Sequence, residues 1–423
     1  MIKKFIMLFV LTCSLVAYDS TVEIVKRMDR LPKIIFQDAS SENMQQGFLQ
    51  KFHKIIAGDL RVSSHFLVDD TYFKSSFDGN LQENFMSETK SDLILRYQLS
   101  FQEDENILAK IKLINAKNGQ TDFYKIYQIS DTQRYPFLAH KIAVDINAYI
   151  GAPDIKWMEQ FVIFAKYTDA KQSEIVISDY TLSFQKTVLK GGLNIFPKWA
   201  NKNQDAFYYT SYNGAKPTLF KVYLSSGKRE RVYASDGMIV CSDVSKDGNK
   251  LLVTMAPQGQ TDIFLYDLTS KKMQKLTQYQ GIDVGANFID DDSRIVFVSD
   301  RLGYPNIFAK TIGDSSLEQM VYHGKNNNSL SAIENYIVYS SREKESEFGS
   351  GTFNLYLIST QTDFIRQLTA SGVNLYPRFA DDKETILYIK YLKDQSALGV
   401  IRLNANKSYH FPLKVGKIQS IDW

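Results

Sequence analysis

The sequence predicts a small N-terminal α/β domain followed by a six-bladed β-propeller that its last strand closes. Three observations support this fold class. The 423 residues include 25 Tyr and 27 Phe, which are residue types that favour strands. Helical periods occur before about residue 152, whereas later segments alternate over short runs separated by Gly, Asn, Asp and Ser. A unit of 44 to 46 residues recurs through that second region, and such a period is typical of propeller blades.

The first 17 residues have the layout of a secretory signal peptide. Lys3 and Lys4 precede an apolar run, and the segment ends with the small residue Ala17. This run is far shorter than the roughly 20 residues that span a bilayer. We expect cleavage after Ala17; the alternative is a lipoprotein signal at Cys13, although the threonine before that cysteine is unusual. After export, the single remaining cysteine, Cys241, cannot form an intramolecular disulfide.

Residues 18–152 mix helical and strand periods, which predicts a compact α/β domain. One helix is expected over residues 40–60, where apolar residues share one face after a capping-type Ser-Ser-Glu. A second helix is expected over residues 138–150, with Gly151 as its stop. Between the two helices we expect an antiparallel ribbon whose tight turn is Asn118-Gly119. Its strands fall over residues 92–101, 107–114 and 123–127.

Six apolar or aromatic residues mark the repeat in the second region. Each closes a short run that reads as the first strand of a blade, and successive residues are 45, 44, 45, 46 and 44 positions apart. The alternative is a β-sandwich in which the spacing arises by coincidence, and six regularly placed residues disfavour it. The six residues are Trp199, Val244, Phe288, Ile333, Phe379 and Trp423.

The two ends of this region complement one another. Residues 418–423 read as a first strand with nothing after it, whereas residues 161–189 read as three outer strands without a first strand. Placing the last strand in the first blade closes the ring and leaves no open sheet edge. The predicted organisation is a signal peptide (1–17), an α/β domain (18–152) and a six-bladed β-propeller (153–423).

Composition and motifs argue against several classes of function. Lys and Arg number 50 against 47 Asp and Glu, for a net charge of +3, so there is no electrostatic case for binding nucleic acid or an anionic membrane. The sequence contains no nucleophile elbow, zinc motif, P-loop or dinucleotide-binding motif. His53 and His140 fall on the predicted helices, where packing is expected, and Asp290-Asp291-Asp292 is expected to form a turn rather than a calcium site. We predict no catalytic, metal or cofactor site, so protein recognition is the default function.

Five segments carry recognisable patterns. In the first domain, a D-L-x-x-S-x-x-F pattern ends the first predicted helix, and a longer segment similar to H-x-I-x-D-x-I leads into the propeller, where Asp154 replaces an expected second glycine. The blades contribute two N-x-x-P-x-[WF] runs and one run similar to S-D-R-x-G-x-P-x-I-[FY], whereas the blade that contains Ile333 lacks the proline. The segments are residues 48–66, 139–167, 194–199, 374–379 and 300–308.

Taken together, these segments resemble the periplasmic TolB family of the Tol-Pal system. The first-domain segments are the specific part of this resemblance, because other propellers share the blade motifs. The resemblance covers the whole mature chain and implies a non-enzymatic periplasmic adaptor, without a cofactor, that supports outer-membrane integrity and invagination during cell division. The implied partners are the lipoprotein Pal and the inner-membrane protein TolA. The alternatives are a periplasmic hydrolase that contains a propeller and an assembly factor for outer-membrane proteins.

The resemblance also implies where these partners bind. TolA would contact the start of the mature chain, which alternates polar and apolar residues and could add as a strand to a partner's sheet; an edge strand of its own domain is the alternative. This segment comprises Tyr18, Asp19, Ser20, Thr21, Val22, Glu23, Ile24 and Val25.

Pal would dock over the channel mouth, on the loops expected just before the six marker residues. Several of these residues are apolar or aromatic, which suits a set of binding hot spots; the alternative for Phe196 and Tyr376 is packing inside the channel. The resemblance favours the loops around Met238 and Val284 most strongly. The candidate residues are Asn194, Ile195, Phe196, Met238, Ile239, Cys241, Asp283, Val284, Gly285, Asn328, Ser329, Asn374, Leu375, Tyr376 and Gln419.

Overall fold

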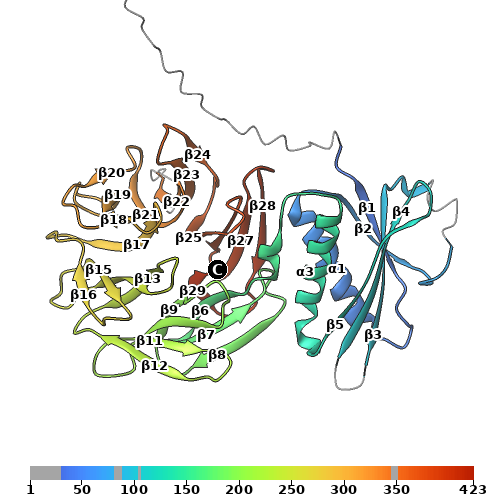
Figure 1. Ribbon diagram of the computed structural model, residues 1–423, viewed down its shortest axis with the longest axis horizontal. Coiled ribbons are helices and arrows are strands. Elements are labelled where there is room, and N and C mark those ends of the chain that lie inside the picture. Colours follow the sequence, from blue (N-terminus) through green and yellow to red (C-terminus); the bar gives the residue numbers. More distant parts are fainter. Residues whose placement is uncertain (1–29, 81–87, 103–105, 344–350) are drawn as a thin grey trace, which may run out of the picture. The chain divides into compact units, whose positions relative to one another are not determined.

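The computed structural model describes residues 30–80, 88–102, 106–343 and 351–423 (Figure 1). Residues 32–423 form one compact unit. The predicted signal peptide and residues 18–25 lie outside the described residues. In the described parts of the chain, no helix is long and apolar enough to cross a membrane.

The first part of this unit is a five-stranded sheet in the order β2-β1-β3-β4-β5, with β1 parallel to both of its neighbours. Two helices pack against one face of the sheet and bury a core that includes Phe52, Leu95 and Ile142, each 0% exposed. The elements are β1 (Lys33–Asp38), α1 (Gln46–Ser63), β2 (Leu67–Lys74), β3 (Leu93–Phe101), β4 (Ile107–Asn115), β5 (Thr121–Ile129), the short 3-10 helix η2 (Thr132–Arg134) and α3 (Tyr135–Tyr149).

The predicted ribbon and second helix are confirmed, but the first helix begins later than expected. It starts at Gln46 because Ser40 is occupied elsewhere: its hydroxyl accepts a hydrogen bond from the Leu99 amide at 2.9 Å, and its own amide donates to Asp38 Oδ1 at 2.8 Å. Ser40 therefore follows the end of β1 and bonds to β3 rather than capping a helix. The helix also continues through Gly58 to Ser63, and the sequence reading missed β1 and β2 altogether.

Six four-stranded blades follow, as predicted, and two of them are joined by a single strand contact. The 3-10 helix η3 (Lys156–Glu159) leads into blade I, and the expected boundary at 152/153 falls between α3 and η3. Blade I consists of β29 (Lys417–Asp422), β6 (Val162–Asp169), β7 (Gln172–Ser178) and β8 (Gln185–Lys190). Its innermost strand, β29, pairs antiparallel with β6, so the last strand closes the ring (Figure 1).

The other blades take their strands in chain order from the inside outward. Blade II has β9 (Asn194–Trp199), β10 (Ala206–Ser211), β11 (Thr218–Tyr223) and β12 (Arg229–Ala234), and blade III has β13 (Ile239–Val244), β14 (Lys250–Met255), β15 (Asp262–Asp267) and β16 (Met273–Lys275). Blade IV has β17 (Asp283–Ile289), β18 (Arg294–Ser299), β19 (Asn306–Thr311) and β20 (Glu318–Gln319). Blade V has β21 (Lys325–Ile333), β22 (Tyr336–Arg342), β23 (Phe353–Ser359) and β24 (Ile365–Gln367), and blade VI has β25 (Val373–Phe379), β26 (Thr385–Tyr391), β27 (Ser396–Arg402) and β28 (Lys407–Pro412).

A buried charge cluster joins the two helices to blade I. His140 of α3 lies between two carboxylates, with Nδ1 2.9 Å from Asp59 of α1 and Nε2 3.3 Å from Asp179, which follows β7. All three side chains are 0% exposed, and Tyr180 donates a hydrogen bond to Asp59 at 2.5 Å. Burial alone would lower the pKa of His140, but the two carboxylates outweigh burial and raise it to about 10. His140 therefore packs in the interior, as expected, but as a charged link between elements.

Candidate protein-binding site in the propeller channel

The channel is lined by the innermost strands of the six blades, β9, β13, β17, β21, β25 and β29, and each of these strands is irregular near its middle. The pairing of each with the second strand of its blade shifts register there, as a β-bulge does. Four residues at the mid-strand bulges have a positive φ: Phe196 (55°), Gly285 (64°), Ser329 (48°) and Tyr376 (54°), and Asn326 (56°) has one at a second register shift near the start of β21. For the non-glycine residues this conformation costs on the order of 1–3 kcal/mol each, and such strain tends to occur at functional sites.

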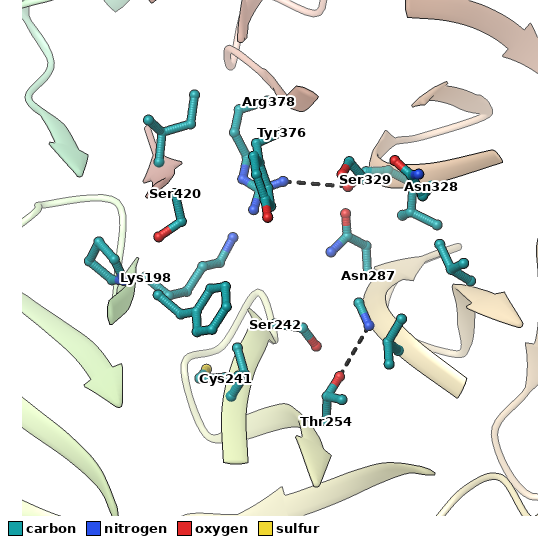
Figure 2. A pocket seen from close by; sticks show the side chains of 18 of the residues that line it. Lys198, Cys241, Ser242, Thr254, Asn287, Asn328, Ser329, Tyr376, Arg378 and Ser420 are labelled. Carbon is teal, nitrogen blue, oxygen red and sulfur yellow. Dashed lines mark hydrogen bonds between the residues drawn. The ribbon is translucent and has the colours of Figure 1, made fainter. Parts of the chain in front are cut away.

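The bulges open into a cavity of about 310 Å³ that is lined by all six inner strands (Figure 2). Half-buried apolar and aromatic side chains from the first halves of these strands form much of its wall. We call this set the entry mouth: Phe196, Met238, Val240, Val284 and Tyr376.

Below the bulges, the inner strands carry a set of paired charges that we call the charged ring, formed by Lys198, Asp243, Arg378 and Asp422. Lys198 Nζ lies 3.0 Å from Asp422 Oδ1 and 3.2 Å from Asp243 Oδ1. Arg378 Nε lies 3.2 Å from the same Asp422 oxygen. Figure 2 shows the ends of Lys198 and Arg378 directed into the opening. Because the positive and negative groups balance, the ring carries no net charge.

The charged ring also ties neighbouring blades together through their backbones. Asp422 accepts a hydrogen bond from the Trp199 amide at 2.8 Å, and Asp243 accepts one from the Phe288 amide at 2.9 Å. Burial alone would lower the pKa of Lys198, but Asp422 and Asp243 outweigh it and hold that pKa above its usual value. Lys198 therefore remains an ammonium that links three blades.

At the opposite end of the channel, the turns between first and second strands carry ion pairs that we call the exit mouth. Lys202 lies 3.3 Å from Asp381, and Lys246 and Lys383 pair with Asp291 and Glu334. Each of these six side chains is more than half exposed, so each pair contributes little to stability. Asp291 is part of the Asp290–Asp292 run, which forms the β17–β18 turn with positive φ at all three residues, as expected of a turn.

Comparison with known proteins places the chain in a family. The family model described as the TolB beta propeller domain matches residues 159–423. The curated protein named Tol-Pal system protein TolB of Wolinella succinogenes is 52% identical over 412 residues, which are 97% of this chain and 97% of that protein. The chain belongs to the TolB family. The proteins of the same name from Campylobacter jejuni and Helicobacter pylori are 47% and 40% identical over at least 99% of each chain.

A solved structure agrees with the fold of this TolB-family chain. The crystal structure of TolB from Acinetobacter baumannii superposes with a TM-score of 0.72 and covers 93% of this chain and 98% of its own. Its sequence is 18% identical, so this likeness bears on the fold alone. It agrees with the predicted order of an α/β region followed by a propeller.

The structure brings ten of the fifteen residues predicted for Pal docking to the channel opening. Eight line the cavity, and Leu375 and Gln419 line a groove beside it that also includes Tyr376. Phe196 and Tyr376 face the cavity and are half-buried. Their exposure is therefore intermediate between that of a docking residue and that of a residue packed inside the channel. The eight are Phe196, Met238, Cys241, Val284, Gly285, Asn328, Ser329 and Tyr376.

The other five were expected at exposed loop tips, but they lie in or at the start of strands with buried side chains. Asn194 and Asn374, the asparagines of the N-x-x-P runs, donate to the carbonyls of Gly191 and Ser371, three residues earlier, and so stabilise the preceding turns. Asp283 is 0% exposed and pairs with Arg301 at 3.0 Å. Ile195 and Ile239 are 8% and 0% exposed. None of the five presents a free side chain to a partner.

The sequence reading overlooked the charged ring, although the repeat contains a signal for it. The residue before each marker residue faces the channel in most blades, and four of these six positions carry a charge: Lys198, Asp243, Arg378 and Asp422. When the same position of a repeating β unit carries a charged residue in several blades, the pattern predicts a polar channel wall. Within the described ranges, no group of three or more His, Cys, Asp and Glu residues could hold a metal ion.

Proposed function

We propose that this TolB-family chain is a non-enzymatic periplasmic adaptor of the Tol-Pal system. It binds Pal at the entry mouth and TolA through residues 18–25, and it supports outer-membrane integrity and invagination during cell division. The names of the relatives support the assignment to the Tol-Pal system, since proteins 40–52% identical over nearly the whole chain are called Tol-Pal system protein TolB.

The observation that carries the Pal interface is the entry mouth itself. Phe196, Met238, Val240, Val284 and Tyr376 present apolar surface around one cavity, and large apolar and aromatic side chains at a concave surface are typical binding hot spots. Two of them, Phe196 and Tyr376, keep a positive φ there. The charged ring just beneath is already neutralised, so a partner need only cover the apolar rim.

The exit mouth is a weaker candidate for this interface. Its lysines and carboxylates are paired with one another and well exposed. A partner that docked there would have to separate these pairs or dehydrate them, and buried charge pairs repay that cost poorly. The contrast favours docking at the entry mouth.

The state of the thiol that lines the cavity argues against a hydrolase that would use a cysteine nucleophile there. Cys241 lines the cavity but is 3% exposed, and burial raises the pKa of its thiol well above the usual range. A thiol held in its protonated form is a poor nucleophile.

Cross-linking of intact cell envelopes followed by capture of the tagged protein tests this proposal. We expect Pal and TolA among the cross-linked partners, and loss of the Pal cross-link in Val284→Asp. Recovery of outer-membrane barrel-insertion proteins in their place would favour the assembly-factor alternative. A hydrolytic activity that survives repurification and is abolished by one substitution would overturn the adaptor.

The TolA contact has a separate test. Deleting residues 18–25 removes the alternating segment proposed to add as a strand to TolA. We expect loss of TolA capture with a nearly unchanged melting temperature, because a terminal segment free to reach a partner contributes little to the fold. A matched variant in which the same eight residues are scrambled keeps the length. Normal capture by the deletion would refute the assignment, and a large fall in melting temperature would favour an edge strand of its own domain.

A further inference from the structure

A second concave surface lies beside the entry mouth, between blade VI and blade I. It is an open groove of about 780 Å³, and Tyr376 lines both this groove and the channel cavity. The start of β25, the end of β26 and the start of β29 form its walls, and Tyr167 at the end of β6 contributes from blade I. The groove therefore continues the entry mouth outward along the seam between two blades.

The groove presents exposed aromatic and apolar surface. Tyr167 and Leu392 are each 42% exposed, and Tyr391 is held in place by the hydrogen bond that its hydroxyl donates to the Ile418 carbonyl at 2.8 Å. A tyrosine fixed at its hydroxyl presents a rigid ring face, which is a favourable contact surface because little side-chain freedom is lost on binding.

The charged side chains that line the groove are all positive. Lys393 and Lys417 line it, and among the described residues no acidic side chain does. The Lys417 ammonium lies 5.2 Å from the centre of the Tyr391 ring, so its positive charge sits over the aromatic floor. No described carboxylate forms an ion pair with either lysine, whereas the lysines of the exit mouth are paired.

We propose that this groove binds an extended, acidic segment with an aromatic or large aliphatic side chain, supplied by the same partner that docks at the entry mouth. The side chain would pack on Tyr167 and Tyr391, and its acidic neighbours would meet Lys393 and Lys417. This inference rests on the proposed function and adds to it the chemistry that the partner must carry outside the channel. Because Tyr376 lines both the channel cavity and the groove, one partner can contact the two surfaces at once. Once it has docked at the entry mouth, its acidic segment is held close to the groove at a high effective concentration.

The test compares variants by titration calorimetry with the soluble domain of Pal from the same organism. The groove variant is Lys393→Glu with Lys417→Glu, and its matched control is Lys186→Glu with Lys190→Glu on β8, the outermost strand of blade I, where both lysines are exposed. We expect the groove variant to bind at least tenfold more weakly, with a shallower dependence of affinity on salt. We expect the control to stay within twofold of the parent protein. The exposed Leu392→Ser substitution, which changes no charge, should weaken binding about fivefold.

The outcomes separate the two proposals. If the parent protein does not bind Pal, the proposed function fails and the groove assignment fails with it. If Pal binds and Val284→Asp weakens binding but both groove variants stay within twofold of the parent, the groove assignment alone is overturned. Equal weakening by the groove variant and its control would also overturn it, because the effect would then be one of overall charge. Melting temperatures within a few degrees of the parent confirm that each variant is folded.

Discussion

The entry and exit mouths of the channel are built from the same inner strands, yet they differ in almost every property. At the entry mouth, half-buried apolar side chains surround a cavity beside bulges of positive φ. Toward the exit mouth, ion pairs connect neighbouring blades, first in the half-buried charged ring and then as exposed pairs between turns. One end of each strand carries groups whose interactions are satisfied within the molecule, and the other end carries surface that a partner can cover.

This difference indicates how one repeat serves two purposes. In β9, β13 and β25, a residue of the entry mouth lies at or before the bulge and a residue of the charged ring lies after it. The ion pairs between blades lie below the bulge, whereas above it neighbouring blades are joined by hydrogen bonds to backbone groups, such as that from Thr210 Oγ1 to the Ile239 carbonyl. We therefore expect substitutions below the bulge to change stability and those above it to change binding.

The largest effect is expected in the charged ring. Asp422→Ala removes the carboxylate that pairs with Arg378 and accepts from the Trp199 amide, and it leaves Lys198 with Asp243 alone. Leaving a fully buried charge without a partner costs about 3–5 kcal/mol; the half-buried Arg378 should cost less than this, but the midpoint of chemical unfolding should still fall markedly. Asp422→Asn, which keeps an acceptor for the Trp199 amide, should cost less. An Asp422→Ala protein as stable as the parent would contradict the role given to the ring.

The next effect tests the entry mouth. Val284→Asp places a carboxylate on the apolar wall and should cost about 2 kcal/mol of Pal binding, or roughly a 30-fold increase in Kd. Its unfolding midpoint should stay close to that of the parent, because Val284 is only half-buried. Ile282→Asp is the control, since Ile282 is 49% exposed and does not line the cavity. Equal loss of binding in both proteins would mean that the effect does not come from the cavity.

The smallest effect is expected at the exit mouth. A triple variant with Lys202, Lys246 and Lys383 changed to Ala breaks three exposed pairs. Exposed pairs contribute little to stability, so the melting temperature should change by a few degrees at most and Pal affinity should stay within twofold. A tenfold loss of affinity would show that the exit mouth takes part in docking and would remove the contrast between the two ends.

The sequence predicted the fold more fully than the site. The 44–46-residue spacing and the unpartnered strand at residues 418–423 were sufficient to predict six blades and their closure, because a propeller repeats its packing at a fixed period. Strands β1 and β2 escaped detection because β1 is nearly continuously buried and β2 does not alternate cleanly, so neither shows the period of two that identifies a strand at a surface.

The site was harder to predict because a bulge cannot be read from spacing. Asn194, Asp283 and Asn374 were placed in loops, whereas each lies within the first two residues of a strand. The two asparagines donate to the turn before the strand, and Asp283 pairs with Arg301. The ring residues Lys198 and Asp422 were missed for a related reason: charged residues inside a strand read as its solvent face, although in a closed ring that face is the channel.

The histidine between α1, α3 and blade I has a consequence for how the protein responds to acid and base. The groups that face His140 are Asp59 of α1 with Asp179 and Tyr180 of blade I. Because its folded-state pKa of about 10 lies above the unfolded value of 6.5, its stabilisation is complete below about pH 6.5 and is lost as the pH rises through about 10. Across roughly pH 5 to 8 the imidazole holds its second proton, so it acts as a fixed charge rather than as a sensor. Melting curves should show an alkaline loss of stability that His140→Gln, less stable at neutral pH, does not share; parallel alkaline losses in the two proteins would mean that another group carries the effect.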